Sequence, residues 1–244
     1  FEKLHKSHVN VLPIINKSGE LLGVMTKKGA MRSEMYKPAL NKNGEFVTAA
    51  AIGVSNGIEE RTKALLKIGV DIFMVDTAHG HSKRMIDAIK KVRSIIGEGK
   101  VIYAGTVVTA KGTEDLVNAG ADIIKVGIGA GGSCTTRIMT ANGRPQLSAV
   151  MECVKAAKAK GKHVWADAGI REPRSLALAM AAGATSTMSG TIYAGTYESP
   201  GDIQFDSDGR PYKVSIGMAS TLAVNERFRH LDPFDLEKKK YFRE

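Results

Sequence analysis

Hydrophobic and polar positions follow one repeating order from about residue 47 onward. Apolar runs typical of buried strands lie within 47–54, 68–76, 100–107, 119–127, 163–169 and 182–190. Between them, apolar residues recur at helical spacing at 58–67, 83–95, 110–118, 146–160 and 173–181. Segments 68–76, 119–127 and 182–190 share one pattern, in which a glycine ends a helix before the next strand. Such alternation predicts βαβ units and a parallel sheet.

Polar residues and glycines follow each predicted strand. They lie at 55–57, 76–81, 105–106, 127–137, 167–169 and 189–191. In a (β/α)8 barrel these positions share the carboxyl-terminal face, where the active sites of such enzymes are found. A doubly wound open sheet is the alternative, but six strands with polar residues at one end favour the barrel. We therefore predict an α/β fold, a (β/α)8 TIM barrel that is incomplete, with about six of eight β/α units present.

The first part of the chain has a different pattern. Residues 8–26 predict two short strands joined by an Asn-Lys-Ser-Gly turn, with a helix after them. We expect a small separate unit at 1–34, a linker at 35–45 and the barrel domain at 46–244.

A glycine-rich segment at 127–137 follows one of the apolar strands. Its glycines allow the backbone to approach a ligand closely. Cys134 then lies on a loop after the strand, where a thiolate can act as a nucleophile. The alternative is a plain turn with a buried structural cysteine.

Composition narrows the class of protein. The chain has 244 residues, of which 43% are hydrophobic and 25% charged, as in ordinary globular proteins. It has no apolar run of the roughly 18 residues that a membrane span needs, and no signal-peptide pattern. Cys134 and Cys153 are the only cysteines and lack metal-site spacing, so we expect a reduced, cytoplasmic protein.

The net charge of +10 has two interpretations. A basic chain can bind nucleic acid or anionic lipid. Here the lysines are dispersed over predicted helix surfaces, without aromatic interleaving, so we expect a solvated surface and no nucleic-acid or membrane partner. The charge also favours phosphorylated small molecules as ligands.

Several longer motifs carry a resemblance to a known family. They lie at 75–82, 127–137, 143–146, 165–170, 194–201 and 217–220. From Phe46 to about Ser220 the chain resembles the IMP dehydrogenase/GMP reductase family. The resemblance implies that residues 1–34 are the C-terminal remnant of a CBS domain, inserted after the second barrel strand. It also implies a mobile flap in the C-terminal region of 46–244, and a chain that lacks the first two barrel strands.

Segments 151–153, 200–202 and 212–220 resemble the GMP reductase branch related to IMP dehydrogenase. This branch implies NADPH-dependent reduction of GMP to IMP and ammonia. One alternative is an IMP dehydrogenase that oxidises IMP to XMP with NAD. Another is a truncated remnant that binds nucleotides without catalysis.

The resemblance assigns the catalytic roles. Cys134 would attack purine C2 and form a covalent intermediate in either enzyme. Thr136, paired with Glu244, would carry the proton chemistry of a reductase. Dehydrogenases use an Arg-Tyr pair instead, and here Arg227 is followed by Phe228, which favours the reductase.

The resemblance also assigns the binding residues. Those for substrate are Asp167 for the ribose, Gly169, Gly190 and Thr191 for the phosphate, and Gly217, Met218 and Ala219 around the base. Those for the dinucleotide, NADPH or NAD, are Asp76, Thr77, Ala78, Thr106, Gly127 and Gly129. The carbonyls of Gly129, Gly131 and Cys134 would hold K⁺, and a homotetramer is expected. Ala168 stands where the family usually has glycine, and Ser215 where dehydrogenases have a phosphate-binding tyrosine.

Overall fold

The computed structural model of the chain describes residues 1–217, 220–229 and 232. The chain divides into two compact units, Phe1–Val47 and Thr48–Glu244. The assignment of the first unit to a CBS domain stays a prediction.

The first unit is a hairpin with two helices. Its elements are α1 (Glu2–Lys6), β1 (Val11–Ile15), β2 (Leu21–Thr26) and α2 (Lys27–Met35). Strands β1 and β2 pair antiparallel. Asn16 closes the turn between them, because its Oδ1 accepts hydrogen bonds from the backbone N–H groups of Ser18 and Glu20. Thr26 caps α2 by accepting a hydrogen bond from Gly29 N at 2.9 Å.

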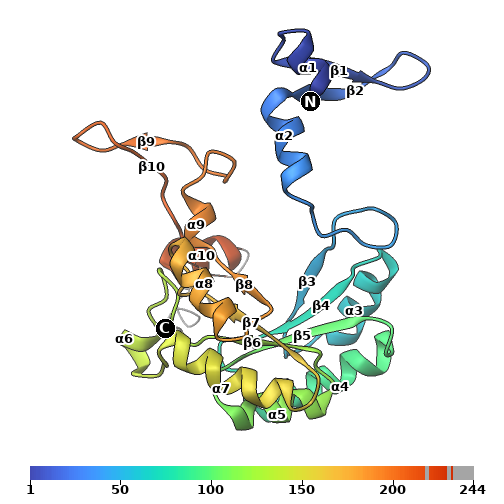
Figure 1. The fold of residues 1–244 in the computed structure, drawn as a ribbon. Coiled ribbons are helices and arrows are strands. Elements are labelled where there is room, and N and C mark those ends of the chain that lie inside the picture. The colour runs from blue at the N-terminus through green and yellow to red at the C-terminus, as the bar shows by residue number, and fades with distance from the viewer. Residues whose placement is uncertain (218–219, 230–231, 233–244) are drawn as a thin grey trace. The chain divides into compact units, whose positions relative to one another are not determined.

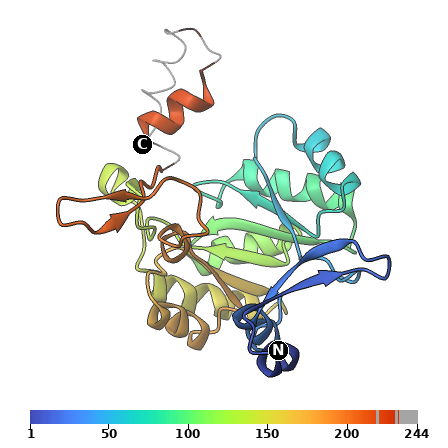
Figure 2. The same ribbon diagram turned by 90° about the horizontal axis from the view of Figure 1, so that it is seen from above.

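The second unit is built on a six-stranded parallel sheet. The strands are β3 (Ala49–Ile52), β4 (Ile72–Asp76), β5 (Val101–Val107), β6 (Ile123–Val126), β7 (His163–Asp167) and β8 (Ser186–Met188). Each strand pairs in parallel with the next in the chain, so their order is β3-β4-β5-β6-β7-β8. This is half of a parallel barrel, and the prediction of an incomplete α/β barrel with about six units is confirmed (Figures 1 and 2).

Helices connect the strands and cover one face of the sheet. They are α3 (Ile58–Lys67), α4 (Lys83–Ile96), α5 (Ala110–Ala119), α7 (Gln146–Lys158) and α8 (Pro173–Ala181). Figure 1 shows α4, α5 and α7 side by side beneath the strands. Ser82 and Thr109 cap α4 and α5 with their hydroxyls, and Gly120 ends α5 at φ +115°. These are the start and stop signals that made the helices predictable.

The hydrophobic core lies between this helix layer and the sheet. Phe73 and Val75 on β4 and Ile124 on β6 are fully buried there against Ile89 of α4 and other core residues. Because side chains alternate along a strand, the residues between them face the other side of the sheet. That side carries Asp76, among other residues, and it leads to the polar carboxyl ends of the strands.

A charged cluster fixes the opposite, amino-terminal end of β6. The Asp122 carboxylate accepts hydrogen bonds from Arg93 Nη2, from Lys162 Nζ at 2.7 Å and from Ile102 N at 3.0 Å. Burial disfavours the charged carboxylate, but these donors outweigh it and lower the pKa of Asp122 below its ordinary value. Arg93 also donates to the Gly120 carbonyl, so the cluster ties α4 to the end of α5.

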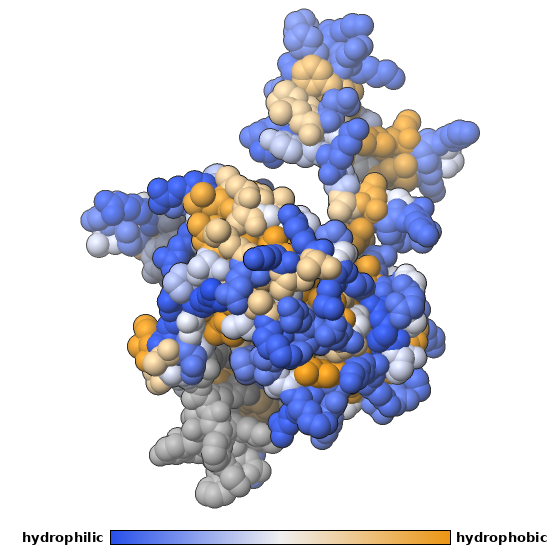
Figure 3. Space-filling model, turned by 60° about the horizontal axis from the view of Figure 1, so that its bottom comes forward, coloured by the Kyte–Doolittle hydropathy of each residue, from blue (hydrophilic) through white to orange (hydrophobic). Residues whose placement is uncertain are grey.

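Six short elements were not predicted. They are α1, α6 (Thr136–Thr140), α9 (Thr191–Ala194), β9 (Gln204–Phe205), β10 (Pro211–Tyr212) and α10 (Thr221–Arg227). Strands β9 and β10 form a small hairpin that stands away from the barrel layers (Figure 2). Within the residues described, no helix is long and apolar enough to cross a bilayer. Figure 3 shows hydrophilic residues spread widely over one face, as expected for dispersed lysines.

Candidate active site

One cavity at the carboxyl ends of the strands gathers most of the predicted residues. It has a volume of about 260 Å³. The predicted residues that line it are Asp76, Thr77, Ala78, Thr106, Gly127, Gly129, Gly131, Cys134, Thr136 and Asp167. They come from the ends of β4, β5, β6 and β7 and from the loop between β6 and α6. The structure therefore brings together the predicted nucleophile, its acid–base partner and the dinucleotide residues, while their roles stay predictions.

Cys134 is exposed at the edge of this cavity. Its Sγ donates a hydrogen bond to Thr136 Oγ1 at 3.3 Å. The second cysteine differs, because Cys153 is fully buried in α7 and burial raises the pKa of its thiol to about 11. Cys153 is therefore a neutral core residue, whereas Cys134 is accessible to a ligand.

Lys125 lies between two carboxylates on the wall of the cavity. Its Nζ is 2.6 Å from Asp167 Oδ2 and 3.0 Å from Asp76 Oδ1. Burial opposes the charge of this side chain, which is only 11% exposed, but Asp167 and Asp76 outweigh burial and raise the pKa of the ammonium. A Cβ at Gly105, opposite Lys125 on β5, would overlap the lysine's own Cβ. The glycine thus leaves room for the lysine.

Lys125 is a site residue that the sequence analysis missed. It lies within the apolar run 119–127, where the pattern predicts a buried strand and gives the lysine no role. The available signal was its charge, since a lysine within a buried strand needs a nearby partner.

Two hydroxyls near this cluster are buried without a hydrogen-bond partner among the described residues. Thr106 Oγ1 belongs to a residue that lines the cavity, and Tyr103 OH lies deeper on the same strand. Burial and the charges of Asp167 and Asp76 raise the pKa of Tyr103, so it stays protonated. An unsatisfied hydroxyl at a cavity wall is what a polar ligand satisfies. The Thr106 hydroxyl is therefore available to a polar group of a ligand in this cavity.

A second cavity, of about 570 Å³, adjoins the first and shares Gly131 and Ala168 with it. It is lined by the predicted phosphate residues Gly169, Gly190 and Thr191. Arg171 and Ser215 line it as well. The sequence analysis did not identify Arg171 as a site residue. The available signal was its position, because a guanidinium just after a glycine-containing strand end can bind an anionic ligand. The residues predicted to bind phosphate thus line a cavity beside that of Cys134, and their role stays a prediction.

Gln146 locks the strand ends between the two cavities. Its Nε2 donates to the carbonyls of Val126 at 2.8 Å and Asp167 at 3.0 Å. Gly127 passes this point at φ +148°, and a Cβ there would overlap the Asp167 carbonyl oxygen. Ala168 also adopts a left-handed conformation, with φ +66°.

Four predicted residues remain, of which the structure describes only Gly217. Gly217 lines neither cavity in the described structure, although it lies beside Ser133, a residue of the second cavity. Met218, Ala219 and Glu244 lie outside the described residues, so their predicted roles stay predictions.

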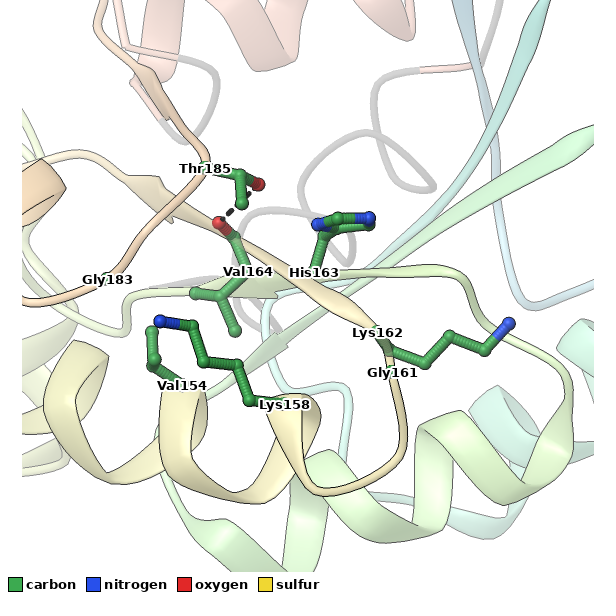
Figure 4. A pocket seen from close by; sticks show the side chains of 8 residues that line it. All are labelled: Val154, Lys158, Gly161, Lys162, His163, Val164, Gly183 and Thr185. Carbon is green, nitrogen blue, oxygen red and sulfur yellow. Dashed lines mark hydrogen bonds between the residues drawn. The ribbon is translucent and has the colours of Figure 1, made fainter.

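A third cavity lies beside the amino ends of β7 and β8, away from these residues. It is about 270 Å³ in volume and is lined by Lys158, Lys162 and His163, among others. Figure 4 shows that the two lysines point in different directions, and Lys162 is paired with Asp122. These cations do not converge on one ligand, which leaves the carboxyl-terminal cavities as the candidate active site.

The chain is similar to proteins of one known family. Residues 15–244 match the family described as IMP dehydrogenase / GMP reductase domain. The whole chain is 48% identical to the GMP reductase of Mycobacterium tuberculosis, covering 51% of that protein. It is 41% identical over 242 residues to the inosine-5'-monophosphate dehydrogenase of Aquifex aeolicus, covering 49% of it.

A solved structure is also similar. The crystal structure of GMP reductase from Trypanosoma brucei in complex with guanosine 5'-monophosphate has a TM-score of 0.74 and 34% sequence identity, and the match covers 93% of this chain and 48% of that one. The chain therefore spans about half the length of the relatives that it matches.

Proposed function

Because the chain belongs to the IMP dehydrogenase/GMP reductase family, we propose that the protein reduces GMP to IMP and ammonia with NADPH. The observation that carries this proposal is the hydrogen bond between Cys134 and Thr136, at 3.3 Å, in a cavity that adjoins the second cavity of about 570 Å³. The reductase is preferred over the dehydrogenase because Thr136 lies beside the nucleophile and Phe228 follows Arg227, where dehydrogenases have tyrosine.

Cys134 and Thr136 perform the covalent chemistry. The Cys134 thiolate forms a bond to purine C2, and the C2 amino group departs as ammonia. Thr136 is within hydrogen-bond reach of the sulfur and passes a proton to the departing group, together with Glu244. NADPH, when bound, supplies the hydride that C2 receives, after which the S–C2 bond breaks and returns the thiolate. In sum, GMP, NADPH and two protons give IMP, NADP⁺ and ammonium.

The second cavity holds the phosphate end of the nucleotide. Asp167, which lines the neighbouring first cavity, accepts hydrogen bonds from the ribose hydroxyls, and its ion pair with Lys125 holds the carboxylate in place. The backbone N–H groups of Gly169, Gly190 and Thr191 and the Arg171 guanidinium bind the phosphate. Gly217, Met218 and Ala219 flank the base.

The first cavity holds the dinucleotide and a cation. Asp76, Thr77, Ala78, Thr106, Gly127 and Gly129 would contact the nicotinamide half, and the unsatisfied Thr106 hydroxyl supports this assignment. The Gly129, Gly131 and Cys134 carbonyls are hard oxygen donors on one loop, as K⁺ requires. K⁺ there would hold the loop in shape around Cys134. We also propose that the protein is a homotetramer and that it is located in the cytoplasm.

The test uses the full-length protein with GMP plus NADPH, and separately with IMP plus NAD. Absorbance of the reduced dinucleotide should fall in the first reaction and stay constant in the second. Formation of NADH from IMP, without NADPH consumption by GMP, would instead establish the dehydrogenase. Neither reaction, combined with tight GMP binding, would establish the non-catalytic nucleotide binder. Cys134→Ser should abolish turnover, whereas the matched control Cys153→Ser should retain it.

A further inference from the structure

Lys213 binds three backbone carbonyls with one ammonium group. Its Nζ donates to Thr196 O at 2.8 Å, to Ser199 O at 2.5 Å and to Tyr197 O at 3.3 Å. No carboxylate in the part of the chain that the structure describes forms an ion pair with it. A surface lysine normally keeps its ammonium group in water. Here all three N–H donors of the ammonium are used on carbonyls of one loop, so the contact is a specific structural one.

The contact joins two walls of the phosphate cavity. The three carbonyls follow directly after α9, whose Thr191 and Ala194 line that cavity. Lys213 comes directly after β10 and two residues before Ser215, which lines the same cavity. The intervening residues, 200–212, form the β9–β10 hairpin (Figure 1). Lys213 thus closes the base of this hairpin and ties the Ser215 segment to α9.

We propose that Lys213 is a positioning residue for the nucleotide phosphate, an inference that rests on the proposed function of the cavity. Hydrogen bonds from a charged donor are about twice as strong as neutral ones, so this contact holds the two walls at a fixed separation. Without the Lys213 contact, the Ser215 segment moves relative to the α9 N–H groups. Phosphate binding then has to fix both walls of the cavity, and this entropic cost weakens the binding. Lys213 lines neither the cavity of Cys134 nor the second cavity. Its loss therefore weakens the binding of a phosphorylated ligand and leaves the binding of the nucleoside unchanged.

The test compares GMP with guanosine on Lys213→Ala, in the full-length protein, by titration calorimetry. We expect GMP affinity to fall by about tenfold or more, which corresponds to 1.4 kcal/mol. Guanosine affinity should change by less than about twofold, well below that step. Lys160→Ala, which removes an exposed lysine after α7, is the matched control and should change neither affinity.

Chemical rescue separates positioning from general damage. n-Propylammonium supplies the atoms that Lys213→Ala removes, so it should restore GMP affinity in this variant and have no effect on wild type. Lys213→Arg keeps a charged donor and should stay within a few-fold of wild type. The positioning role would be overturned if Lys213→Ala weakened GMP and guanosine binding equally. It would also be overturned if neither n-propylammonium nor the arginine variant restored GMP affinity. A wild-type protein that binds no GMP would overturn the proposed function itself, whereas unchanged GMP binding by Lys213→Ala would overturn only this inference.

Discussion

Lys125 Nζ lies 2.6 Å from Asp167 Oδ2, across the pairing of β6 and β7. The same ammonium reaches Asp76 on β4, so one lysine compensates two carboxylates from different strands. These carboxylates serve different halves of the proposed site, Asp167 the nucleotide and Asp76 the dinucleotide. Lys125 therefore joins the two halves of the proposed site through ion pairs with both carboxylates.

Lys125→Met should lower the free energy of unfolding by about 3 kcal/mol, because both carboxylates lose their buried partner. Urea denaturation at pH 7 measures this. Lys111→Met is the matched control, since it breaks the exposed pair with Asp115 and should cost less than about 1 kcal/mol. Equal effects of the two substitutions would show that Lys125 contributes no more than a surface lysine.

The contribution of Lys125 should disappear at high pH. Its folded-state pKa is raised, so its stabilising effect is complete below the unfolded pKa of about 10.4 and is lost as the pH rises through the folded pKa. The difference in unfolding free energy between wild type and Lys125→Met should be constant from pH 7 to 10 and shrink above that. A difference that stays constant to higher pH would contradict the assignment.

Asp122→Asn should show the opposite pH dependence. The pKa of Asp122 is lowered in the folded state, so its stabilisation is present above the unfolded value of about 3.9 and is lost as the pH falls through the folded value. We expect a loss of about 2 kcal/mol at pH 7 and a smaller loss near pH 3, measured by denaturant titration. Asp208→Asn changes an exposed carboxylate and should be nearly neutral at both pH values.

Ala168→Gly should stabilise the protein by up to about 1 kcal/mol. Alanine at φ +66° is strained by roughly 1–2 kcal/mol, and glycine removes this strain at a smaller cost in unfolded-state entropy. Thermal denaturation gives the sign. Ala177→Gly, on the exposed face of α8, should destabilise by about 1 kcal/mol, because that position is helical. If both Ala168→Gly and Ala177→Gly lowered the stability, Ala168 would not be strained in the folded protein.

Gly127→Ala should destabilise the protein by about 3 kcal/mol or more. The added Cβ would overlap the Asp167 carbonyl oxygen, a backbone atom that Gln146 holds in place. Gly99→Ala is the matched control, since a Cβ there meets no atom within 4 Å. Denaturant titration of the two variants should separate them clearly, and similar stabilities would mean that the strand ends can move apart.

The helix layer was predictable because its signals are local. The bounds of α3 and α8 coincide with the predicted 58–67 and 173–181, since Gly69 and Pro173 mark their ends within a few residues. The polar carboxyl ends were predictable for the same reason, as each motif directly follows its strand. Hairpin β9–β10 was missed because two residues per strand leave no periodicity to detect.

The charge pairs of the site could not be predicted in this way. Lys125 is separated from Asp76 by 49 positions in the chain, and no local sequence pattern in either segment indicates that the two side chains meet. Lys213 likewise finds its carbonyls only after the chain has turned through a hairpin. Such contacts depend on the curvature of the sheet and the path of loops, which hydrophobic periodicity does not encode.

Strand β6 carries charge at both ends, with Asp122 just before it and Lys125 within it. A slip of this strand by one residue would turn Lys125 toward the apolar helix layer and Ile124 toward the cavity. It would also separate Asp122 from Ile102 N. An unpaired ammonium among apolar side chains costs several kcal/mol, so misaligned forms of the sheet are penalised during folding. Lys125 therefore also favours the correct register of β6 during folding.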